Sequence, residues 1–596
     1  MQGADRCLLH LLFILIDGKG IGNEAMSKWL VYTKKADFKA IQEKYGIDQV
    51  IARIIRNRDV CTEHEIEIYL SGTLDDLHSP YLLKDIEKAV GILIQKIKCG
   101  SKIRIIGDYD IDGVCSITIL YKALIKAGAV ADYVVPHRIR DGYGINENLI
   151  DNAIEEGVDT IITCDNGIAA INQIHYAKEH NLTVIVTDHH DIPFVEEDGV
   201  KKLLESEADA IVNPKQTECN YPFDKICGAA VAFKLAQVLY DKCSLDKSDL
   251  KEYSELMAVA TVGDVVDLKD ENRVIVKNGL KSLATTKNMG IRALTESCKL
   301  DITHLTAYHI GFIIGPCLNA SGRLDTAKRA IELLLCDNPA EAHIMAEDLR
   351  ELNEERKNLT DTEAKRAVRL VEGTELSDDK VLVVYLHECH ESVAGIIAGR
   401  LRERFYKPVI VITDASEGAK GSGRSIEGYN MFEEISKCAS LLTKFGGHPM
   451  AAGLSLPKEN IDIFRKQLNA NQTLTEKELT PVIWIDVPMP VSYVNIKLVE
   501  QLHVLEPFGK GNEKPVFADR NLTVRSVNII GKNRNVLKMQ LESADGHLVE
   551  AVQFKVDEAH VPLCGQRISI VYYPDINEYN GNHSLQFVVQ EWCVTK

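Results

Sequence analysis

Short, largely apolar runs alternate with amphipathic helical segments in the first half of the chain. The runs Ile103–Ile106, Thr160–Thr163, Thr183–Val186 and Ala210–Val212 have the length of buried strands. The segments between them repeat their apolar residues at helical spacing. Strands that alternate with helices in this way are typical of a parallel sheet, so we expect an α/β domain over residues 101–336.

A long helical pattern follows this domain. Asn338-Pro339-Ala340-Glu341 is a helix start, with an asparagine N-cap, a proline at the first position and a glutamate that can close a capping box. The pattern continues to Val371, and Gly373 is the expected C-cap. A helix over residues 337–373 would be roughly 50 Å long and would hold two domains apart with a groove between them.

A second α/β domain is expected over residues 374–478. Val381–Leu386 and Pro408–Thr413 are strand-like and flank a helical segment, Ser392–Tyr406. The glycine-rich stretches KGSGRS and FGGHP are interpreted as loops that let the backbone approach a phosphate, or as turns formed for steric reasons alone.

The sequence pattern changes over residues 479–596, where short β-like runs alternate with turns. Asp545-Gly546 and Asn580-Gly581 are hairpin signals, and about five strands in this length predict an OB-type barrel. Lys532, Arg534 and Lys538 give local positive charge. Several aromatic residues are candidates either for stacking on bases or for the barrel core: Phe508, Phe517, Tyr572, Tyr573 and Tyr579.

The beginning of the chain has less pattern. Residues 26–100 are expected to form a small helical lead-in. The apolar run Leu8–Ile16 is too short to span a bilayer, and it lacks the basic leader and the cleavage site of a secretory signal. We therefore treat residues 1–25 as an extension of doubtful status.

The composition limits the classes of protein to which this chain can belong. The 596 residues are too many for one core, and 45% hydrophobic with 26% charged residues is ordinary for a globular protein. The 15 cysteines include no CxxC pair, which favours a reducing cytoplasm over a disulfide framework or a zinc cluster. A net charge of −18 argues against a protein that coats nucleic acid, so a phosphate substrate would need local positive charge or bound metal.

Acidic residues follow the first predicted strand. Asp108, Asp110 and Asp112 stand at alternate positions, and Gly113 and a helical pattern come next. Three carboxylates this close repel one another unless a cation is present, and hard divalent ions prefer oxygen ligands. The alternative is an acidic turn with Asx-type hydrogen bonds.

The next two predicted strands are also followed by candidate metal ligands. Asp165 follows the second strand, and Asp188, His189 and His190 follow the third. Because parallel strands bring their carboxyl ends to one edge, these side chains should converge on the first aspartate group. A surface Asp-His-His is the alternative interpretation.

Three more candidates lie outside these acidic and histidine motifs but before the long helix. Asp264 follows an apolar helix, where an unpaired carboxylate is costly to bury, so it is a candidate metal ligand. Arg138 comes just after a strand end, and Arg323 ends the stretch GPCLNASGR, which we interpret as a loop. Each arginine is a candidate for phosphate binding or for a surface ion pair.

The ordered motifs GDYDIDG, TCDNG, TDHH, GDVVDL, GPCLNASGR, GSGRS, FGGHPMAAG and PFGKGN occur together in this chain. This set resembles the DHH phosphoesterases with an attached DHHA1 domain, and among them the bacterial single-strand-specific exonucleases that carry a terminal barrel. The resemblance implies 5′→3′ release of mononucleotides from single-stranded DNA in repair and recombination, with two divalent cations, Mn²⁺ or Mg²⁺.

The resemblance also implies roles for residues. The implied metal ligands are Asp110, Asp112, Asp165, His189 and Asp264, with Asp165 as the bridging carboxylate. Asp165, His190 and Asp108 are the implied catalytic residues, and the implied substrate-binding residues are Arg138, Arg323, Ser422, Arg424 and His448. In one departure, Ile106 stands where many relatives carry a histidine, which affects one metal position.

The expected partners are single-stranded DNA and, as further candidates, a single-strand-binding protein and a helicase. We expect a cytoplasmic monomer without membrane attachment. Cleavage of short oligoribonucleotides or cyclic dinucleotides, hydrolysis of pyrophosphate, and a binding-only scaffold are the alternatives; the barrel and the intact aspartates argue against them.

Overall fold

The computed structural model describes residues 27–138, 140–142, 144–197, 200–531, 534–556, 560–579 and 581–595. The expectation for residues 1–25 therefore lies outside the described part of the chain. Contacts divide the chain into two compact units. One unit draws on Met1–Leu70, Leu474–Glu506 and Glu513–Lys596, and the other on Ser71–Thr473 and Pro507–Asn512.

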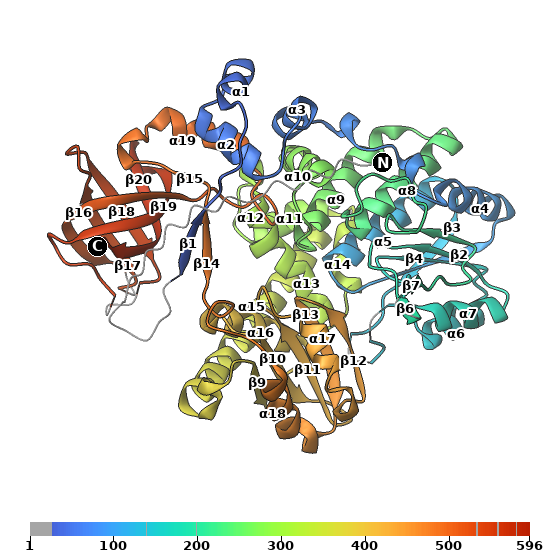
Figure 1. Ribbon diagram of the computed structural model, residues 1–596. Coiled ribbons are helices and arrows are strands. Elements are labelled where there is room, and N and C mark those ends of the chain that lie inside the picture. Colours follow the sequence, from blue (N-terminus) through green and yellow to red (C-terminus); the bar gives the residue numbers. More distant parts are fainter. Residues whose placement is uncertain are drawn as a thin grey trace. The chain divides into compact units, whose positions relative to one another are not determined.

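The second unit contains the predicted parallel sheet, with strand order β3-β2-β4-β5-β8 (Figure 1). Its strands are β2 (Lys102–Gly107), β3 (Val130–Val134), β4 (Thr160–Cys164), β5 (Thr183–Thr187) and β8 (Ala210–Val212). All neighbouring strands pair in parallel. The predicted βαβ pattern is therefore confirmed.

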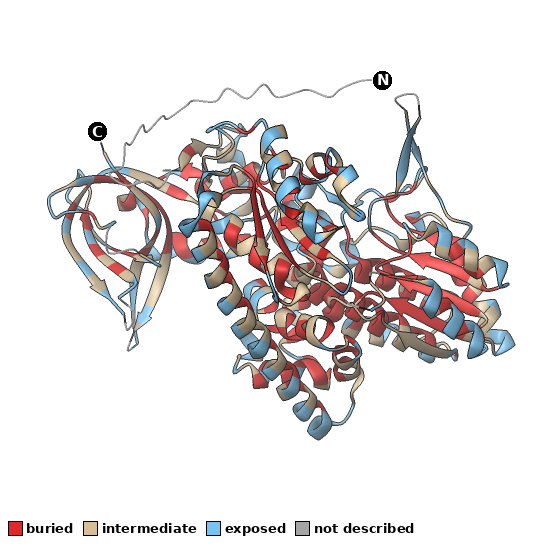
Figure 2. Cartoon of the chain, turned by 90° about the horizontal axis from the view of Figure 1, so that it is seen from below, coloured by how far each residue is buried: buried red, intermediate tan, exposed pale blue. Residues whose placement is uncertain are grey.

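Helices bury both faces of this sheet, as the buried central strands show (Figure 2). Alternate residues of each strand face two separate apolar clusters, because side chains alternate along a strand. The helices around it are α4 (Ile86–Cys99), α5 (Ile111–Lys126), α6 (Glu147–Glu155), α7 (Ile171–Glu179) and α8 (Gly228–Cys243). A short antiparallel hairpin, β6 (Phe194–Glu197) with β7 (Val200–Leu203), precedes β8.

A helical layer extends this core. It comprises α9 (Leu250–Gly263), α10 (Asp270–Leu283), α11 (Met289–Ser297), α12 (Ala307–His309), the π-helical turn η5 (Ile310–Ile314), α13 (Gly315–Leu324) and α14 (Lys328–Leu335). The expected loop in GPCLNASGR is wrong, because this stretch is helix α13. One of its two glycines has a clear packing role: a Cβ at Gly322 would lie 2.2 Å from the carbonyl oxygen of Tyr109.

The long helix is present as α15 (Pro339–Gly373). Asn338 is its N-cap and accepts a hydrogen bond from the Ala340 N–H, as expected. Glu341 accepts from the side-chain amide of Asn338. The C-terminal prediction is wrong by one residue, since Gly373 is still helical and Thr374 is the C-cap.

The second α/β region has the mixed sheet order β12-β13-β11-β10-β9. Its elements are β9 (Leu382–Leu386), α16 (Ala394–Phe405), β10 (Val409–Asp414), β11 (Ala419–Arg424), α17 (Met431–Ser436), β12 (Lys444–His448), β13 (Ala451–Leu456) and α18 (Ile461–Asn471). The strands and the helix predicted here are confirmed, but the two glycine-rich stretches are not loops. GSGR lies in β11 and FGGH forms β12, since glycine here serves close strand packing as well as turns.

The other unit joins the beginning and the end of the chain. It contains β1 (Lys28–Val31), α1 (Phe38–Tyr45), α2 (Gln49–Asn57), α3 (Glu63–Ser71), β14 (Val482–Ile485) and α19 (Ile496–Leu502). Strand β1, which was not predicted, pairs in parallel with β14. A buried ion pair also links these segments: Arg58 Nη1 lies 2.7 Å from Asp486 Oδ1.

The terminal sheet runs β15-β16-β17-β18-β20-β19, and an additional pairing of β16 with β19 closes it. Its strands are β15 (Val487–Pro488), β16 (Phe517–Ile530), β17 (Val536–Glu542), β18 (Leu548–Phe554), β19 (Arg567–Tyr579) and β20 (Asn582–Val594). Phe517, Tyr572 and Tyr573 are buried, so they form barrel core and do not stack on bases. Lys532, Asn580 and the Tyr579 side chain lie outside the described part of the structure.

None of the described helices is both long enough and apolar enough to cross a membrane.

Candidate active site

The loop after β2 carries the first carboxylates. Asp110 is the N-cap of α5 and accepts hydrogen bonds from the N–H groups of Asp112 (3.0 Å) and Gly113 (3.2 Å). The Ile111 N–H donates to Asn319 Oδ1 at 2.8 Å, so α13 holds the loop from the other side. Asn319 was not predicted as part of the site.

The N-terminus of α8 binds the next carboxylate. Both oxygens of the buried Asp112 accept backbone N–H groups, from Gly228 at 2.6 Å and from Ala229 at 2.7 Å. A helix N-terminus stabilises negative charge. A Cβ at Gly228 would lie 2.7 Å from Asp165 Cβ, so only glycine permits this approach. This contact was not predicted, although a glycine that opens an apolar helical run is its signal in the sequence.

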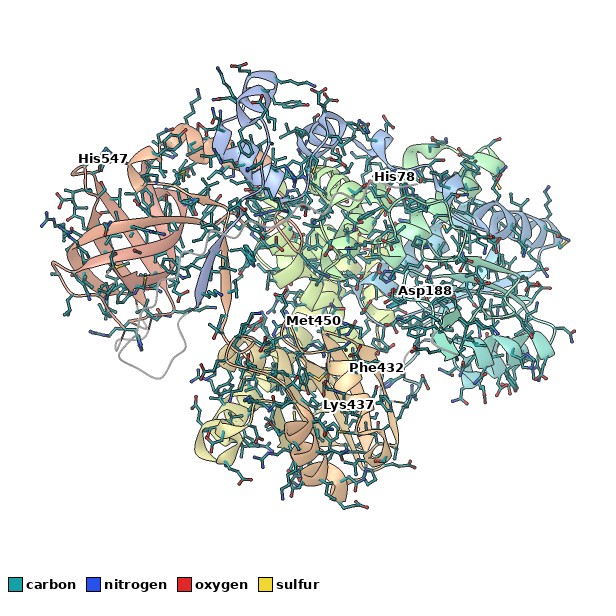
Figure 3. The ribbon with its side chains drawn as sticks, viewed as in Figure 1. His78, Asp188, Phe432, Lys437, Met450 and His547 are labelled. Carbon is teal, nitrogen blue, oxygen red and sulfur yellow. The ribbon has the colours of Figure 1, made fainter. Side chains whose placement is uncertain are left out.

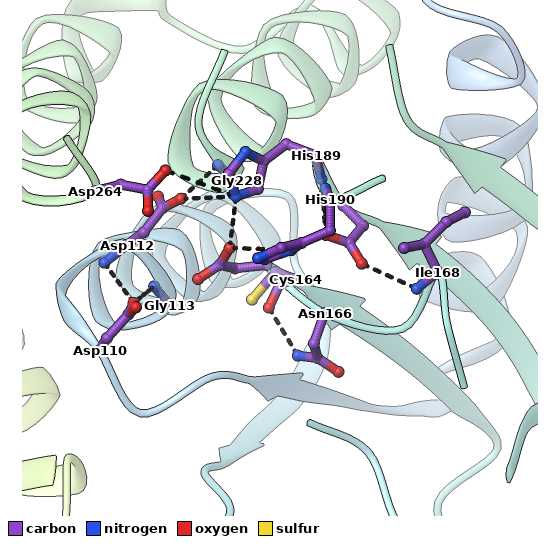
Figure 4. Close-up of polar contacts among 12 residues, drawn as sticks. Asp110, Asp112, Gly113, Cys164, Asn166, Ile168, His189, His190, Gly228 and Asp264 are labelled. Atoms are coloured by element: carbon purple, nitrogen blue, oxygen red, sulfur yellow. Dashed lines mark hydrogen bonds and ion pairs between the residues drawn. The ribbon is translucent and has the colours of Figure 1, made fainter. Parts of the chain in front are cut away.

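Asp165 follows β4 and His189 lies just after β5, and both residues contribute to this site; Figure 4 shows His189 beside Asp112 and Asp264. Asp165 has a left-handed backbone (φ 59°), and its N–H donates to Thr187 O at 3.1 Å. The Nε2 atom of His189 lies 3.1 Å from Asp165 Oδ1, 3.6 Å from Asp112 Oδ2 and 3.8 Å from Asp264 Oδ2. A single ring nitrogen therefore faces three carboxylates, and Asp264 at the end of α9 joins the cluster.

Asp188 orients the second histidine of the motif. It lies at the carboxyl end of β5 (Figure 3) and accepts hydrogen bonds from the N–H of Ile168 at 2.9 Å and from Nδ1 of His190 at 2.8 Å. Burial acts to raise the pKa of Asp188, but the bond to His190 and the charge of that ring lower it to about 2. Burial acts to lower the pKa of His190, but Asp188 raises it to about 9.

The other groups of the protein compensate the negative charges of the clustered carboxylates poorly. Burial, followed by the charge of Asp110, raises the pKa of Asp112 to about 6. Burial and neighbouring aspartates likewise raise the pKa of Asp108, Asp165 and Asp264. Burial, and then the charge of His190, lowers the pKa of His189 to about 3, so this ring is neutral at pH 7 and can act as a ligand.

This donor set fits divalent cations. Three groups of ligand atoms each lie within 4.8 Å of one another: Asp108, Asp110 and Asp165; Asp112, His189 and Asp264; and Asp165, His189 and His190. Asp108 Oδ1 and His189 Nε2 are buried without a hydrogen-bond partner among the described residues. Carboxylate oxygens with an imidazole nitrogen suit Mn²⁺ and Mg²⁺. Ile106, by contrast, is buried in the apolar cluster under α6 and α7 and contributes only its carbonyl oxygen, which accepts from Asn166 Nδ2 at 3.0 Å.

A groove of about 1480 Å³ opens beside this cluster. Asp188 and His190 line one part of it, and the lining also includes all five predicted substrate-binding residues: Arg138, Arg323, Ser422, Arg424 and His448. The structure thus gathers them from both α/β regions of this unit.

The arginines are held by the groove itself. The Arg138 guanidinium lies 4.6 Å from the centre of the Tyr109 ring. Arg323 Nη1 donates to Ser392 O at 2.9 Å, and Arg424 Nη1 donates to Gly423 O at 2.7 Å and to Ser422 Oγ at 3.3 Å.

Several positive charges of the groove repel one another. Burial and then the charge of Arg138 lower the pKa of Arg323 to about 9. Burial and the charge of Arg402 lower the pKa of Arg424, and burial and the charge of Arg424 lower the pKa of His448. An anionic ligand would relieve this repulsion.

Three family models match the chain: the DHH family N-terminal domain over residues 102–261, the DHHA1 domain over 378–473, and the RecJ OB domain over 485–591. The single-stranded-DNA-specific exonuclease RecJ of Bacillus subtilis is 36% identical over 577 residues, which covers 96% of this chain and 71% of that protein. The protein of the same description from Escherichia coli is 34% identical and covers 91% of this chain and 95% of its own length.

Solved structures agree with these matches. A structure of exonuclease RecJ bound to manganese is 31% identical, with a TM-score of 0.56, and covers 65% of this chain and 94% of its own. RecJ from Thermus thermophilus in complex with Mn²⁺ shares the fold, with a TM-score of 0.81 at 24% identity; it covers 95% of this chain and 80% of its own.

Proposed function

Because the chain belongs to the family of RecJ single-stranded-DNA-specific exonucleases, we propose that it degrades single-stranded DNA from the 5′ end. The products are 5′-mononucleotides, and the cellular role is DNA repair and recombination. One observation carries the proposal: the buried carboxylate–histidine cluster opens onto a groove that also presents arginines from a second α/β region.

The cluster divides into proposed ligands and proposed catalytic groups. The proposed ligands are Asp110, Asp112, Asp165, His189 and Asp264. Asp165 takes part in two of the three ligand groups, which supports a bridging role between two ions. When bound, two divalent cations lower the pKa of a water molecule and offset the charge of a phosphate.

His190 and Asp108 are the other proposed catalytic residues. Asp188 engages Nδ1 of His190, so the ring would donate a proton from Nε2 to a phosphate oxygen or to the leaving oxygen. Asp108 Oδ1 is buried and directed into a site where the described chain gives it no hydrogen-bond partner, which supports a contact with a bound group.

The arginine side of the groove is the proposed binding site for the DNA. Arg138, Arg323, Ser422, Arg424 and His448 would hold backbone phosphates, and the paired Ser422 and Arg424 would take the terminal 5′-phosphate. A two-metal centre is nearly symmetric about an in-line displacement, so an asymmetric contact of this kind is needed to set the direction of digestion.

We further propose that the chain works as a cytoplasmic monomer and that a single-strand-binding protein and a helicase are its partners. We also propose the division into a lead-in (26–100), a DHH domain (101–336), a connecting helix (337–373), a DHHA1 domain (374–478) and an OB-type domain (479–596).

The test is a digestion with Mn²⁺ of single strands labelled at the 5′ end or at the 3′ end, with duplex DNA and RNA as controls. Labelled mononucleotide should appear at once from the 5′-labelled strand and only late from the 3′-labelled strand. Early release from the 3′ label, or equal digestion of duplex, would contradict the proposal.

A further inference from the structure

Two cysteine thiols meet in the helical layer of the larger unit. Cys298 is the C-cap of α11 and is half-buried, whereas Cys317 lies in α13 and is buried. Their Sγ atoms are 3.8 Å apart, so the two sulfurs are in contact without a covalent bond. Because a disulfide bond is about 2.05 Å long, a relative shift of roughly 1.8 Å would bring the two sulfurs to bonding distance.

The long helix α15 holds this thiol pair from a third side. Helices α11 and α13 both pack against α15 (Figure 1). The buried Asn353 of α15 donates from Nδ2 to Cys317 Sγ at 3.3 Å, and its Oδ1 accepts from Arg356 Nη2 at 2.6 Å. The sulfur of Cys317 is therefore fixed in the packed interior, and Cys298 is its partner at a helix end.

Cys298 is the more reactive of the two thiols. The hydrogen bond with Cys317 lowers the pKa of Cys298 against the effect of burial, and the charges of Lys357 and Arg350 act in the same direction. The same hydrogen bond, and then burial, raises the pKa of Cys317. Oxidants attack the thiolate, and redox-sensing cysteines are partly exposed thiols of low pKa with a second thiol beside them.

Helix α13 connects the thiol pair to the candidate active site. Two residues after Cys317, the Oδ1 atom of Asn319 accepts the Ile111 N–H at 2.8 Å, in the loop that carries Asp110. Arg323, near the end of the same helix, lines the groove. A displacement of α13 is therefore transmitted both to the carboxylate loop and to a candidate phosphate contact.

We propose that hydrogen peroxide converts Cys298 and Cys317 into a reversible disulfide and that this bond slows the enzyme. This inference rests on the proposed function, because it assigns a regulation to the same site. Disulfides in a reducing compartment are usually transient and redox-sensing, and cellular thiols would restore this pair.

The reaction proceeds in two steps. The Cys298 thiolate attacks one oxygen of the peroxide; the O–O bond breaks, a sulfenic acid forms, and the released hydroxide takes up the proton of the thiol to give water. The Cys317 sulfur then attacks the sulfenic sulfur; the S–O bond breaks, and a second water molecule leaves with the Cys317 proton. The two thiols lose two electrons, and the peroxide is reduced to two water molecules.

The test compares the enzyme before and after oxidation. The wild type, Cys298→Ser and Cys317→Ala are treated with hydrogen peroxide, catalase removes the excess, and release of mononucleotide from single strands is measured with Mn²⁺. In the wild type, kcat/KM should fall about ten- to a hundredfold, the cost of moving a reactive group by about 1 Å. Peptide mapping should show the Cys298–Cys317 disulfide, and dithiothreitol should remove it and restore the rate.

The variants provide the controls. Cys298→Ser and Cys317→Ala should each keep their own untreated rate after peroxide, and two variants are used so that a folding defect in one does not decide the result. Cys336→Ser removes another half-buried cysteine of the same unit, at the C-cap of α14, where its thiol lies 3.3 Å from Asn338 O. It should respond to peroxide as the wild type does.

The outcomes distinguish the switch from the exonuclease proposal. An equal loss of rate in the wild type and both pair variants, no disulfide in the wild type, or a disulfide without a change in rate would each overturn the switch. If the reduced wild type releases no mononucleotide, the exonuclease proposal fails. The switch is then decided by calorimetric titration with Mn²⁺: weaker binding after oxidation in the wild type but not in Cys298→Ser supports it, and unchanged binding in both overturns it.

Discussion

The carboxylate of Asp188 accepts a hydrogen bond from Nδ1 of His190 at 2.8 Å, and its other oxygen accepts from the Ile168 N–H at 2.9 Å. Asp188 therefore holds the His190 ring in one orientation. Its role in the reaction is to position His190. This contact is what raises the pKa of His190 to about 9, against the effect of burial.

We expect Asp188→Asn to move the pH profile of the enzyme. Without the carboxylate, the pKa of His190 should fall towards its ordinary value, so the protonated ring is lost at a lower pH. If the protonated ring is the active form, activity should decline at lower pH in the variant than in the wild type, and kcat/KM should fall about tenfold or more at pH 8. The measurement is kcat/KM against pH.

Asp301→Asn is the matched control. Asp301 Oδ2 lies 2.8 Å from Nδ1 of His304 on the protein surface, so it is a carboxylate–histidine pair outside the groove. It should leave the pH profile unchanged. An alkaline limb at the same pH in Asp188→Asn and the wild type would contradict the role given to Asp188.

Removal of metal should destabilise the protein more at neutral pH than at acidic pH. The pKa of Asp112 is raised to about 6, so the protonated carboxyl stabilises the metal-free fold below pH 4, and this contribution is lost as the pH rises through 6. For Asp112 alone the loss is about 3 kcal/mol, and bound cations remove the repulsion that causes it. The rise in Tm on addition of Mg²⁺ should therefore be larger at pH 7.5 than at pH 5. An equal rise at both values would be inconsistent with a cation bound at these carboxylates.

Arg424→Ala should affect recognition of the 5′ end. Loss of one charge-assisted contact costs about 1.5–3 kcal/mol, roughly ten- to a hundredfold in rate. We expect digestion of 5′-phosphorylated strands to slow by this factor and digestion of 5′-hydroxyl strands to slow much less. Arg404→Ala is the control, because Arg404 bonds Glu372 at 2.7 Å and is not among the residues that line the groove. Equal slowing of both strands would make Arg424 a general backbone contact.

Asp486→Ala should destabilise the unit that joins the two ends of the chain. Arg58 and Asp486 are 6% and 2% exposed, and removal of one partner leaves the other charge buried. We expect a loss of about 3–5 kcal/mol in the free energy of unfolding, measured with urea. Glu550→Ala breaks the exposed pair with Lys538 in the same unit and should cost less than about 1 kcal/mol. Similar losses for the two variants would refute the buried pair.

The sequence predicted the parts of the fold that follow from local pattern. Apolar runs gave the parallel sheet, and the convergence of Asp108, Asp165 and His189 follows from parallel topology. The sequence did not show whether a glycine forms a turn or permits close packing. Gly322 in α13 and Gly423 in β11 permit close packing and do not form turns. Strand β1 was missed because its partner, β14, lies more than four hundred residues away and local pattern does not encode such a pairing.

The sequence indicated which side chains converge at the candidate site. It did not indicate the backbone N–H groups that contact them. For acidic and histidine residues at strand ends, the residue type alone indicates a possible metal ligand or proton donor. The N–H groups of Gly228 and Ala229 that bind Asp112 depend on tertiary packing and have only weak signals in the sequence.

The most direct test is release of 5′-mononucleotide from single-stranded DNA with Mn²⁺ by the wild type and by Asp165→Ala. Asp165 takes part in two of the three ligand groups, so its loss should reduce release to the level of the metal-free wild type. Binding of single strands should persist, because the arginines of the groove are unchanged. Near-normal release by a correctly folded Asp165→Ala would contradict the assignment of this cluster as the active site.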